Sequence, residues 1–235
     1  MNLLKSISLW GISNNVNPPL TSFERVSEVY FLRKMLLELS IDCVLDVGAN
    51  RGQFASELRG IGYLGSIISF EPIPSEFAVM RESFKSDPQW AGHAIALGSK
   101  TSSMTITIPK LTVMSSLLES TTPESNTRQE VIEVKRLDEV FHEIVTKKGY
   151  KNVLLKMDTQ GYDLEVFKGA SGCLENIAAV QSELSVRPLY KNMPHYVESL
   201  ETYENAGFDL YNLSVVNRVE DGGLLELNCF MRRAK

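Results

Sequence analysis

Two short segments carry residue types and spacings that suit the binding of a nucleoside. Residues 44–53 place an acid, Asp46, two residues before Gly48, and a second glycine, Gly52, follows four residues later. The apolar run before the glycines is typical of a buried parallel strand, and the glycines turn the chain into a helix that presents free backbone N–H groups. A second apolar run ends on Glu71, a carboxylate suited to ribose hydroxyls. This order of strand, glycine turn, helix, strand and acid predicts a nucleoside site.

The spacing of the glycines indicates which nucleoside cofactor fits. A dinucleotide fold needs Gly-x-Gly-x-x-Gly so that a pyrophosphate can approach the backbone, whereas this chain has Asn50 between Gly48 and Gly52. No lysine follows the turn, as a phosphate-binding loop requires. Asp46 suits a cationic ligand better than a pyrophosphate. S-adenosylmethionine (SAM) carries an ammonium and a sulfonium, so the pattern favours SAM, and a plain strand–helix turn in a structural α/β domain is the alternative.

The elements that must position these residues alternate along the chain. Apolar runs predict strands, and apolar stripes at helical spacing predict helices. We expect a helix over residues 22–40 and a mobile polar loop over residues 115–130. The segments 208–216 and 224–231 flank Asp221-Gly222-Gly223 and should form a terminal antiparallel hairpin. The other expected strands are residues 43–47, 66–70, 92–97, 103–108, 131–134, 152–157 and 177–184.

Strands that alternate with helices and end in a hairpin indicate one fold class. They predict an α/β fold with a doubly wound, mostly parallel, seven-stranded sheet whose last strand runs antiparallel. This is the Rossmann-like sheet of the class I methyltransferases, and it strengthens the SAM hypothesis. We expect an N-terminal arm and helix over residues 1–40, which cap the cofactor or substrate side, and a methyltransferase domain over residues 41–235.

Composition excludes several classes of function. The 235 residues are 43% hydrophobic, enough for one domain with a sizeable core. The net charge of −5 argues against a phosphate-backbone binder, so we expect no nucleic-acid partner. No stretch is long enough to cross a membrane, and the N-terminus makes no convincing signal peptide. Cys43, Cys173 and Cys229 lack metal-like spacing, so we expect buried thiols and a cytoplasmic protein, with a homo-oligomer left open.

Three segments together resemble the FkbM family of SAM-dependent methyltransferases. They are residues 45–53, residues 69–74 and residues 156–163, of which the third, Lys-Met-Asp-Thr-Gln-Gly-Tyr-Asp, is the most family-specific. The resemblance covers roughly residues 41–232. Members of that family are mostly O-methyltransferases that act on sugars or on hydroxyls of natural products. The resemblance therefore implies SAM-dependent O-methylation of a small-molecule or glycan acceptor.

The resemblance also implies which residues hold the cofactor. Asp46, Gly48, Asn50 and Gly52 should surround the amino-acid end of SAM, and Glu71 should hold the ribose hydroxyls. The adenine should lie between two walls, one formed by Pro72 or Ile73 and the other by Ala96 and Leu97 at the end of the third strand.

Three side chains are candidates for the chemistry of methyl transfer, which to an alcohol needs a group that removes the hydroxyl proton. Asp158 and Glu183 follow buried strands whose carboxyl ends meet at one sheet edge. Asp158 is a base or a magnesium ligand, or else it caps the helix that begins near Asp163. Glu183 contacts substrate or metal, or else it pairs with Arg187. His195 is a base in a loop that reaches the cleft, or else a surface residue at a helix start.

Further alternatives concern metal and reaction type. Asp158, Asp163 and Glu183 would form a magnesium site if their oxygens converge, but we do not favour a metal and assign no ligands. Asp163 is expected to cap a helix, and Lys156 to form a buried ion pair. The rival functions are N-methylation of a small amine or amino sugar and a non-catalytic SAM-binding module. The loop over residues 110–130 and the arm over residues 1–20 are expected to order over the acceptor.

Overall fold

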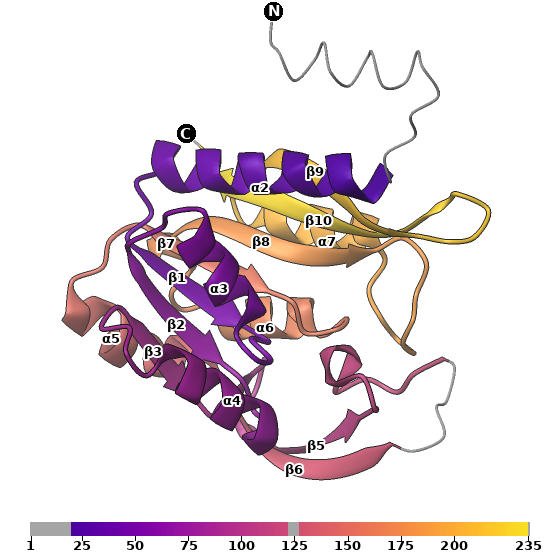
Figure 1. Cartoon of the computed structure of the whole chain (residues 1–235), viewed down its shortest axis with the longest axis horizontal. Coiled ribbons are helices and arrows are strands. Elements are labelled where there is room, and N and C mark those ends of the chain that lie inside the picture. Colours follow the sequence, from indigo (N-terminus) through magenta and orange to yellow (C-terminus); the bar gives the residue numbers. More distant parts are fainter. Residues whose placement is uncertain (1–19, 122–126, 235) are drawn as a thin grey trace, which may run out of the picture.

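A seven-stranded sheet forms the centre of the structure, a computed structural model that describes residues 20–121 and 127–234 (Figure 1). Its strands are β1 (Cys43–Val47), β2 (Ser66–Phe70), β3 (Trp90–His93), β7 (Val153–Met157), β8 (Ile177–Ser185), β9 (Phe208–Arg218) and β10 (Leu224–Arg233). Their order is β3-β2-β1-β7-β8-β10-β9, in which β10 runs antiparallel to both of its neighbours and the other pairs are parallel. The predicted sheet and terminal hairpin are confirmed.

Helices cover both faces of this sheet and complete three layers (Figure 1). They are α2 (Leu20–Glu38), α3 (Gln53–Gly60), α4 (Pro74–Phe84), α5 (Leu137–Ile144), α6 (Asp163–Gly169) and α7 (Tyr196–Asn205). The first three pack with alternate strand residues such as Val44 and Leu154, and the last three pack with the opposite set, such as Leu45 and Leu155. Because β1, β2 and β7 are buried along their whole length, they read as continuous apolar runs, which is why their bounds could be predicted from sequence.

A second, three-stranded sheet lies beyond the carboxyl ends of the parallel strands. It is formed by β4 (Ala96–Leu97), β6 (Arg128–Lys135) and β5 (Ser102–Ile108), in that order. The single strand expected over residues 92–97 is therefore wrong: β3 ends at His93, and Ala96 and Leu97 pair with β6 instead. An apolar run shows that a segment is buried but not which sheet it joins.

The polar segment that follows β5 is more ordered than expected. It contains a short 3-10 helix, η1 (Thr112–Met114), and Thr107 and Ser116 exchange backbone hydrogen bonds of 3.3 and 3.4 Å. The expectation of one mobile loop over residues 115–130 is therefore wrong for residues 115–121 and for the start of β6. The segment 122–126 and the arm over residues 1–19 lie outside the described residues.

Helix α2 forms where it is predicted but buries a different face. The apolar stripe that its sequence predicts includes Val26, Tyr30 and Leu36; Leu36 is buried against the sheet with Leu32 and Met35, whereas Val26 and Tyr30 are exposed. Two apolar stripes run along this helix, and only the position of the sheet selects one of them.

Two expectations from composition can also be compared with the structure. In the part of the chain that it describes, no helix has both the length and the apolar character needed to span a bilayer. Cys43, Cys173 and Cys229 are buried free thiols, as expected, and burial raises the pKa of Cys43 to about 12.

Candidate active site

A cavity opens at the carboxyl ends of β1 and β2, between the main sheet and the small sheet. It encloses about 550 Å³, of which the open mouth is a part. Seven of the nine residues predicted to bind the cofactor line it, and Asp46 and Gly52 do not. The seven are Gly48, Asn50, Glu71, Pro72, Ile73, Ala96 and Leu97.

Glu71 is the buried acid of this cofactor cavity. Its side chain is 4% exposed and accepts hydrogen bonds from two backbone N–H groups, those of Asn50 and Ile73, each at 2.8 Å. Burial raises the pKa of Glu71 to about 7, and the two N–H groups oppose that rise. The carboxylate is therefore held rigidly at the cavity wall, and each oxygen keeps a lone pair for a further donor.

The two glycines of the turn serve packing of the protein itself. Gly48 has φ +77°, and a Cβ atom there would lie 2.0 Å from the carbonyl oxygen of Asp158. Gly52 has φ +85°, and a Cβ atom there would lie 2.6 Å from the ring of Phe84. Both positions require the left-handed backbone that glycine adopts without strain. A side chain at Gly48 would thus collide with the end of β7 before it reached a ligand.

Asp46 lies behind the cavity wall, in a buried ion pair. Its carboxylate accepts a 2.9 Å hydrogen bond from the ammonium of Lys156 on the neighbouring strand, as expected for Lys156. Burial alone would lower the pKa of Lys156, but Asp46 and Asp158 more than offset this and raise it. The charge of Asp46 is therefore largely neutralised within the protein.

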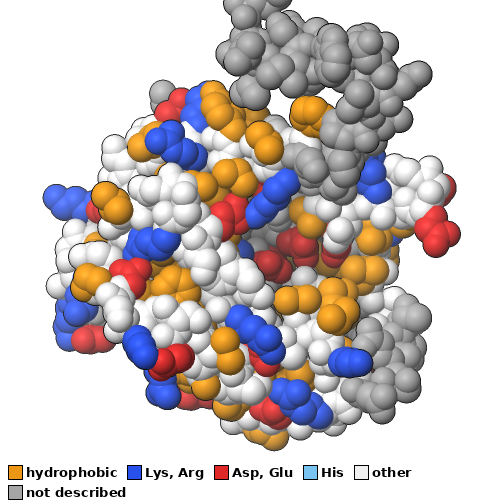
Figure 2. Space-filling view, in the orientation of Figure 1, with side chains coloured by type: hydrophobic (Ala, Val, Ile, Leu, Met, Phe, Trp, Pro, Cys, Tyr) orange, Lys and Arg blue, Asp and Glu red, His pale blue; other side chains and the backbone are white. Residues whose placement is uncertain are grey.

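Asp158 and Glu183 lie close together at the sheet edge, as predicted. The side-chain amide of Gln160 donates to both carboxylates, at 3.3 Å to Asp158 and 3.1 Å to Glu183. The side chain of Asp158 is 42% exposed. Figure 2 shows acidic side chains inside a hollow near the middle of this face. The expected pair of Glu183 with Arg187 does not form, because Arg187 pairs with Asp221.

The surroundings of Glu183 favour its protonated form. Burial, followed by the charges of Asp158 and Glu226, raises the pKa of Glu183 well above the ordinary value. Burial also raises the pKa of Glu226 on the adjacent β10. A carboxylate whose pKa is moved toward neutrality is a better general base near pH 7 than an ordinary one.

Asp163 has a structural role, but the expected helix cap is wrong, since no side chain of the described residues caps the start of α6. Its carboxylate accepts hydrogen bonds from the backbone N–H groups of Thr159 at 2.9 Å and Glu183 at 3.1 Å, and from the hydroxyl of Ser182 at 2.7 Å. It therefore ties the turn after β7 to the end of β8. Across residues 20–121 and 127–234, no three His, Cys, Asp or Glu side chains are placed to hold a metal ion.

His195 lies immediately before α7. It is exposed, its ring packs on Tyr196 with centroids 4.4 Å apart, and its backbone bridges to Ser185 at the end of β8. It does not line the cofactor cavity, so the geometry agrees better with the surface role.

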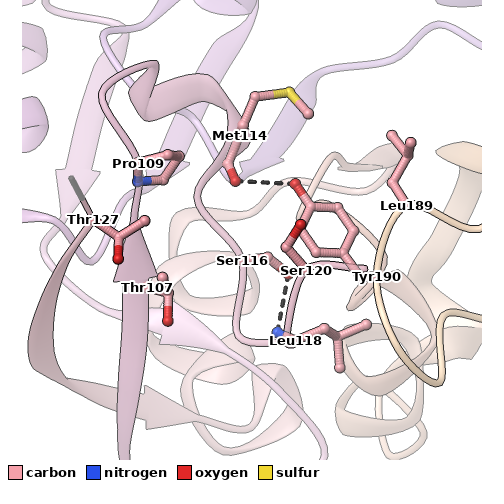
Figure 3. Close-up of a pocket in the computed structure, with 9 residues that line it drawn as sticks. All are labelled: Thr107, Pro109, Met114, Ser116, Leu118, Ser120, Thr127, Leu189 and Tyr190. Atoms are coloured by element: carbon pink, nitrogen blue, oxygen red, sulfur yellow. Dashed lines mark hydrogen bonds between the residues drawn. The ribbon is translucent and has the colours of Figure 1, made fainter. Parts of the chain in front are cut away.

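A segment of the chain, residues 112–118, contributes alternately to the cofactor cavity and to a second cavity, whose lining residues are drawn in Figure 3. Thr112, Val113, Ser115 and Leu117 line the cofactor cavity, and Met114, Ser116 and Leu118 line the second one. The second cavity is lined by hydroxyl and apolar side chains, among them Tyr190, whose hydroxyl donates to the carbonyl of Met114 at 3.0 Å. This segment is also joined to the turn after β7, because the hydroxyl of Ser116 donates to the carbonyl of Gln160 at 2.8 Å.

Three residues at the site, Gln160, Tyr190 and Gln181, carry no role that the sequence predicts. Gln160 bridges the two carboxylates, the Tyr190 hydroxyl lies 3.1 Å from the Gln160 amide oxygen, and Gln181 is buried beside Lys156. Because side chains alternate between the two faces of a strand, Gln181 could have been predicted to share a sheet face with Glu183, two residues later. Tyr190 comes from a loop and carries no such signal.

Comparisons with known proteins agree with this fold. A family model described as the methyltransferase FkbM domain matches residues 46–210. The magnesium protoporphyrin IX methyltransferase (ChlM) of Synechocystis PCC 6803 with bound SAM is similar at a TM-score of 0.50 and 9% identity, over 93% of this chain and 86% of that chain. A proposed methyltransferase from Thermobifida fusca YX is similar at a TM-score of 0.52 and 10% identity, over 92% of this chain and 82% of that chain.

Other similar structures are longer than this chain. Aeropyrum pernix fibrillarin with natively bound SAM is similar at a TM-score of 0.47 and 12% identity, over 81% of this chain and 66% of that chain. The chain thus spans just under two thirds of the fibrillarin, and 62% of TehB from Haemophilus influenzae. No curated protein matches the sequence. Similarity at these identities concerns the fold alone.

Proposed function

Because the chain belongs to the FkbM methyltransferase family, we propose that it transfers a methyl group from SAM to a hydroxyl of a sugar, a glycan or a glycosylated natural product. The observation that carries this proposal is the pair of carboxylates, Asp158 and Glu183, joined through the amide of Gln160. The backbone of Asp158 packs against Gly48 of the cofactor turn. A proton acceptor therefore lies next to the place where the cofactor cavity meets the sheet edge.

The donors and acceptors of the cavity fit SAM. Glu71 offers free lone pairs to the two ribose hydroxyls, and the apolar side chains of Ile73 and Leu97 suit the faces of an adenine. The backbone of Gly48 and Asn50 lies along the same wall. When bound, SAM supplies a methyl group on a sulfonium, which is already activated for displacement.

The protein's own task is then positioning and proton removal. Asp158 would accept the proton of the acceptor hydroxyl as the oxygen–methyl bond forms and the methyl–sulfur bond breaks, with the sulfur keeping its electron pair. Gln160 would hold both carboxylates in place by donating to each. Because the Asp158 side chain is 42% exposed, it would release that proton to solvent before the next turnover.

The test begins with the cofactor. Purified protein is heated in the presence of S-adenosylhomocysteine (SAH), SAM, NAD or NADP, and the melting temperature is compared. We expect stabilisation by SAH and SAM only, because ligands that bind the folded state raise its stability. Stabilisation by NAD or NADP instead would contradict the proposal.

The second step identifies the reaction. The protein is incubated with methyl-labelled SAM and a panel of sugars, amino sugars and glycosides, and the labelled product is analysed by mass spectrometry. Label on oxygen is the expected result, label on nitrogen would indicate an N-methyltransferase, and SAH binding without any transfer across the panel would favour the non-catalytic module. Repetition in excess EDTA tests metal dependence, and we expect activity to persist.

A further inference from the structure

A third cavity lies on the sheet face that α2 and α3 cover. It encloses about 520 Å³, counting its mouth, and shares no lining residue with the cofactor cavity. Glu28 of α2, Glu57 of α3, Gln181 of β8 and Asp158 line it. We call it the α2 cavity. Asp158 is also one of the two carboxylates bridged by Gln160, so the α2 cavity adjoins that pair.

Two buried acceptor atoms in the α2 cavity have no hydrogen-bond partner within residues 20–121 and 127–234. Gln181 is 4% exposed, and its amide oxygen receives no hydrogen bond from any described residue. One carboxylate oxygen of Glu57 is equally unpartnered. Buried polar atoms without partners cost free energy, so such atoms in a native structure call for an occupant. Because both atoms are acceptors, that occupant must bring N–H or O–H donors.

The cavity also carries more negative than positive charge. Three of the side chains that line it, Glu28, Glu57 and Asp158, are carboxylates and two, Arg25 and Lys156, are cations, which leaves an excess of one negative charge. Arg25 donates to Glu28 at 2.7 Å and also pairs with Glu57, while Lys156 lies 2.9 Å from Asp46 and 3.7 Å from Asp158. Such an excess favours a positively charged occupant over a neutral one.

We propose that the α2 cavity binds the protonated amine of the acceptor, which makes the acceptor a polyol that carries an amino group, such as an amino sugar. This inference rests on the proposed function. An ammonium brings three donors and one positive charge, which match the amide oxygen of Gln181 and the surplus negative charge. A hydroxyl of the same molecule then reaches Asp158 at the end of the cavity.

The amine serves as an anchor and not as the nucleophile. Carboxylates around an ammonium stabilise its charged form, and a protonated nitrogen has no lone pair with which to attack the methyl group. The cavity therefore favours methylation of the hydroxyl in a molecule that also contains an amine. The proposal explains how an O-methyltransferase would discriminate among polyols of similar size.

The test measures binding to the protein saturated with SAH, so that the cofactor site is filled. Saturation-transfer NMR at pH 7 compares glucosamine with two neutral analogues, glucose and N-acetylglucosamine. We expect glucosamine to bind about tenfold more tightly than either, the size of one charge-assisted hydrogen bond. Equal affinities for the three sugars would overturn the proposal, and this comparison needs no variant.

Variants locate the binding site. Glu28→Gln removes a charge from the α2 cavity, and we expect the preference for glucosamine to fall about fivefold or more. Glu24→Gln, one turn earlier on the same helix, is the matched control, because Glu24 pairs with Arg218 and does not line the cavity. If Glu28→Gln does not fold, Gln181→Leu removes the unpartnered amide instead. A preference that survives the Glu28 or Gln181 change in folded protein would overturn the assignment.

Two further outcomes separate this inference from the proposed function. If SAH competes with glucosamine, the α2 cavity holds the amino-acid end of the cofactor, and the inference is wrong while SAM binding stands. If the protein binds neither SAH nor SAM, the proposed function is wrong, and the inference that rests on it is wrong as well. The inference alone fails if SAH binds, methyl transfer to neutral sugars occurs, and no preference for the amine is found.

Discussion

Glu71 is a single residue whose ionisation should control cofactor binding. Its pKa is raised to about 7 by burial, and only the ionised form offers both oxygens to ribose hydroxyls. We therefore expect SAH to bind about tenfold more weakly at pH 6 than at pH 8, since protonation competes with the ligand below the pKa of the free site. Isothermal titration calorimetry at several pH values measures this.

The matched variant for this prediction is Glu71→Gln, which keeps the shape of the side chain. It should bind SAH more weakly at pH 8 and lose the dependence on pH between 6 and 8. Because the pKa in the folded state is raised, ionisation of Glu71 opposes folding, and its unfavourable effect grows as the pH rises through 7. A pH dependence that persists in the variant would exclude Glu71 as its cause.

Asp158 is the residue whose loss should separate chemistry from cofactor binding. Asp158→Asn keeps the backbone that contacts Gly48 but removes the proton acceptor, so turnover should fall about 10²–10⁴-fold, the usual contribution of a general base. The dissociation constant of SAH should stay within about threefold. Asp209→Asn, an exposed carboxylate on β9, is the control. Loss of SAH affinity in step with turnover would instead place Asp158 among the cofactor contacts.

At the scale of elements, the segment over residues 112–118 should respond to the cofactor. It is held by three side-chain hydrogen bonds to other parts of the site. Asn50 donates to Thr112 at 3.3 Å, Ser116 donates to Gln160, and Tyr190 donates to Met114. Since Thr112, Val113, Ser115 and Leu117 of this segment line the cofactor cavity, we expect SAH to slow hydrogen exchange of the amides of residues 112–118. The turn at residues 219–223 of the distant hairpin is the internal reference and should not change.

The contribution of this segment can be tested at Ser116. Ser116→Ala removes its hydrogen bond to Gln160, a loss of about 1 kcal/mol. The variant should bind SAH several-fold more weakly and show less protection over residues 112–118. Ser103→Ala, on an exposed position of β5, is the control. Unchanged SAH affinity in Ser116→Ala would mean that the segment lies over the cavity without contributing to binding.

At the scale of the whole molecule, the ion pair between Asp46 and Lys156 joins β1 to β7 at the centre of the sheet. Lys156→Met leaves Asp46 buried without a partner, which should reduce the free energy of unfolding by about 3–5 kcal/mol. The double variant with Asp46→Leu should recover much of this loss, because both charges are then absent. Urea denaturation measures both. Additive losses in the double variant would contradict the prediction that the pair acts as one unit.

The sequence by itself determined the central sheet, the cofactor turn and the acid at the end of β2. These features depend on local signals: a strand buried on both faces is a continuous apolar run, and a sharp strand–helix turn needs glycine. The pairing of Asp158 with Glu183 could also be predicted, because parallel strands end at one edge.

Only the tertiary structure decided how the side chains around this edge are used. It placed Ala96 and Leu97 in a second sheet, turned Asp46 toward Lys156, and assigned Asp163 to the turn after β7. It also brought Gln160 between the two carboxylates and closed the α2 cavity with a helix from the other end of the chain. Contacts of this kind join residues far apart in sequence, and neither spacing nor periodicity carries information about them.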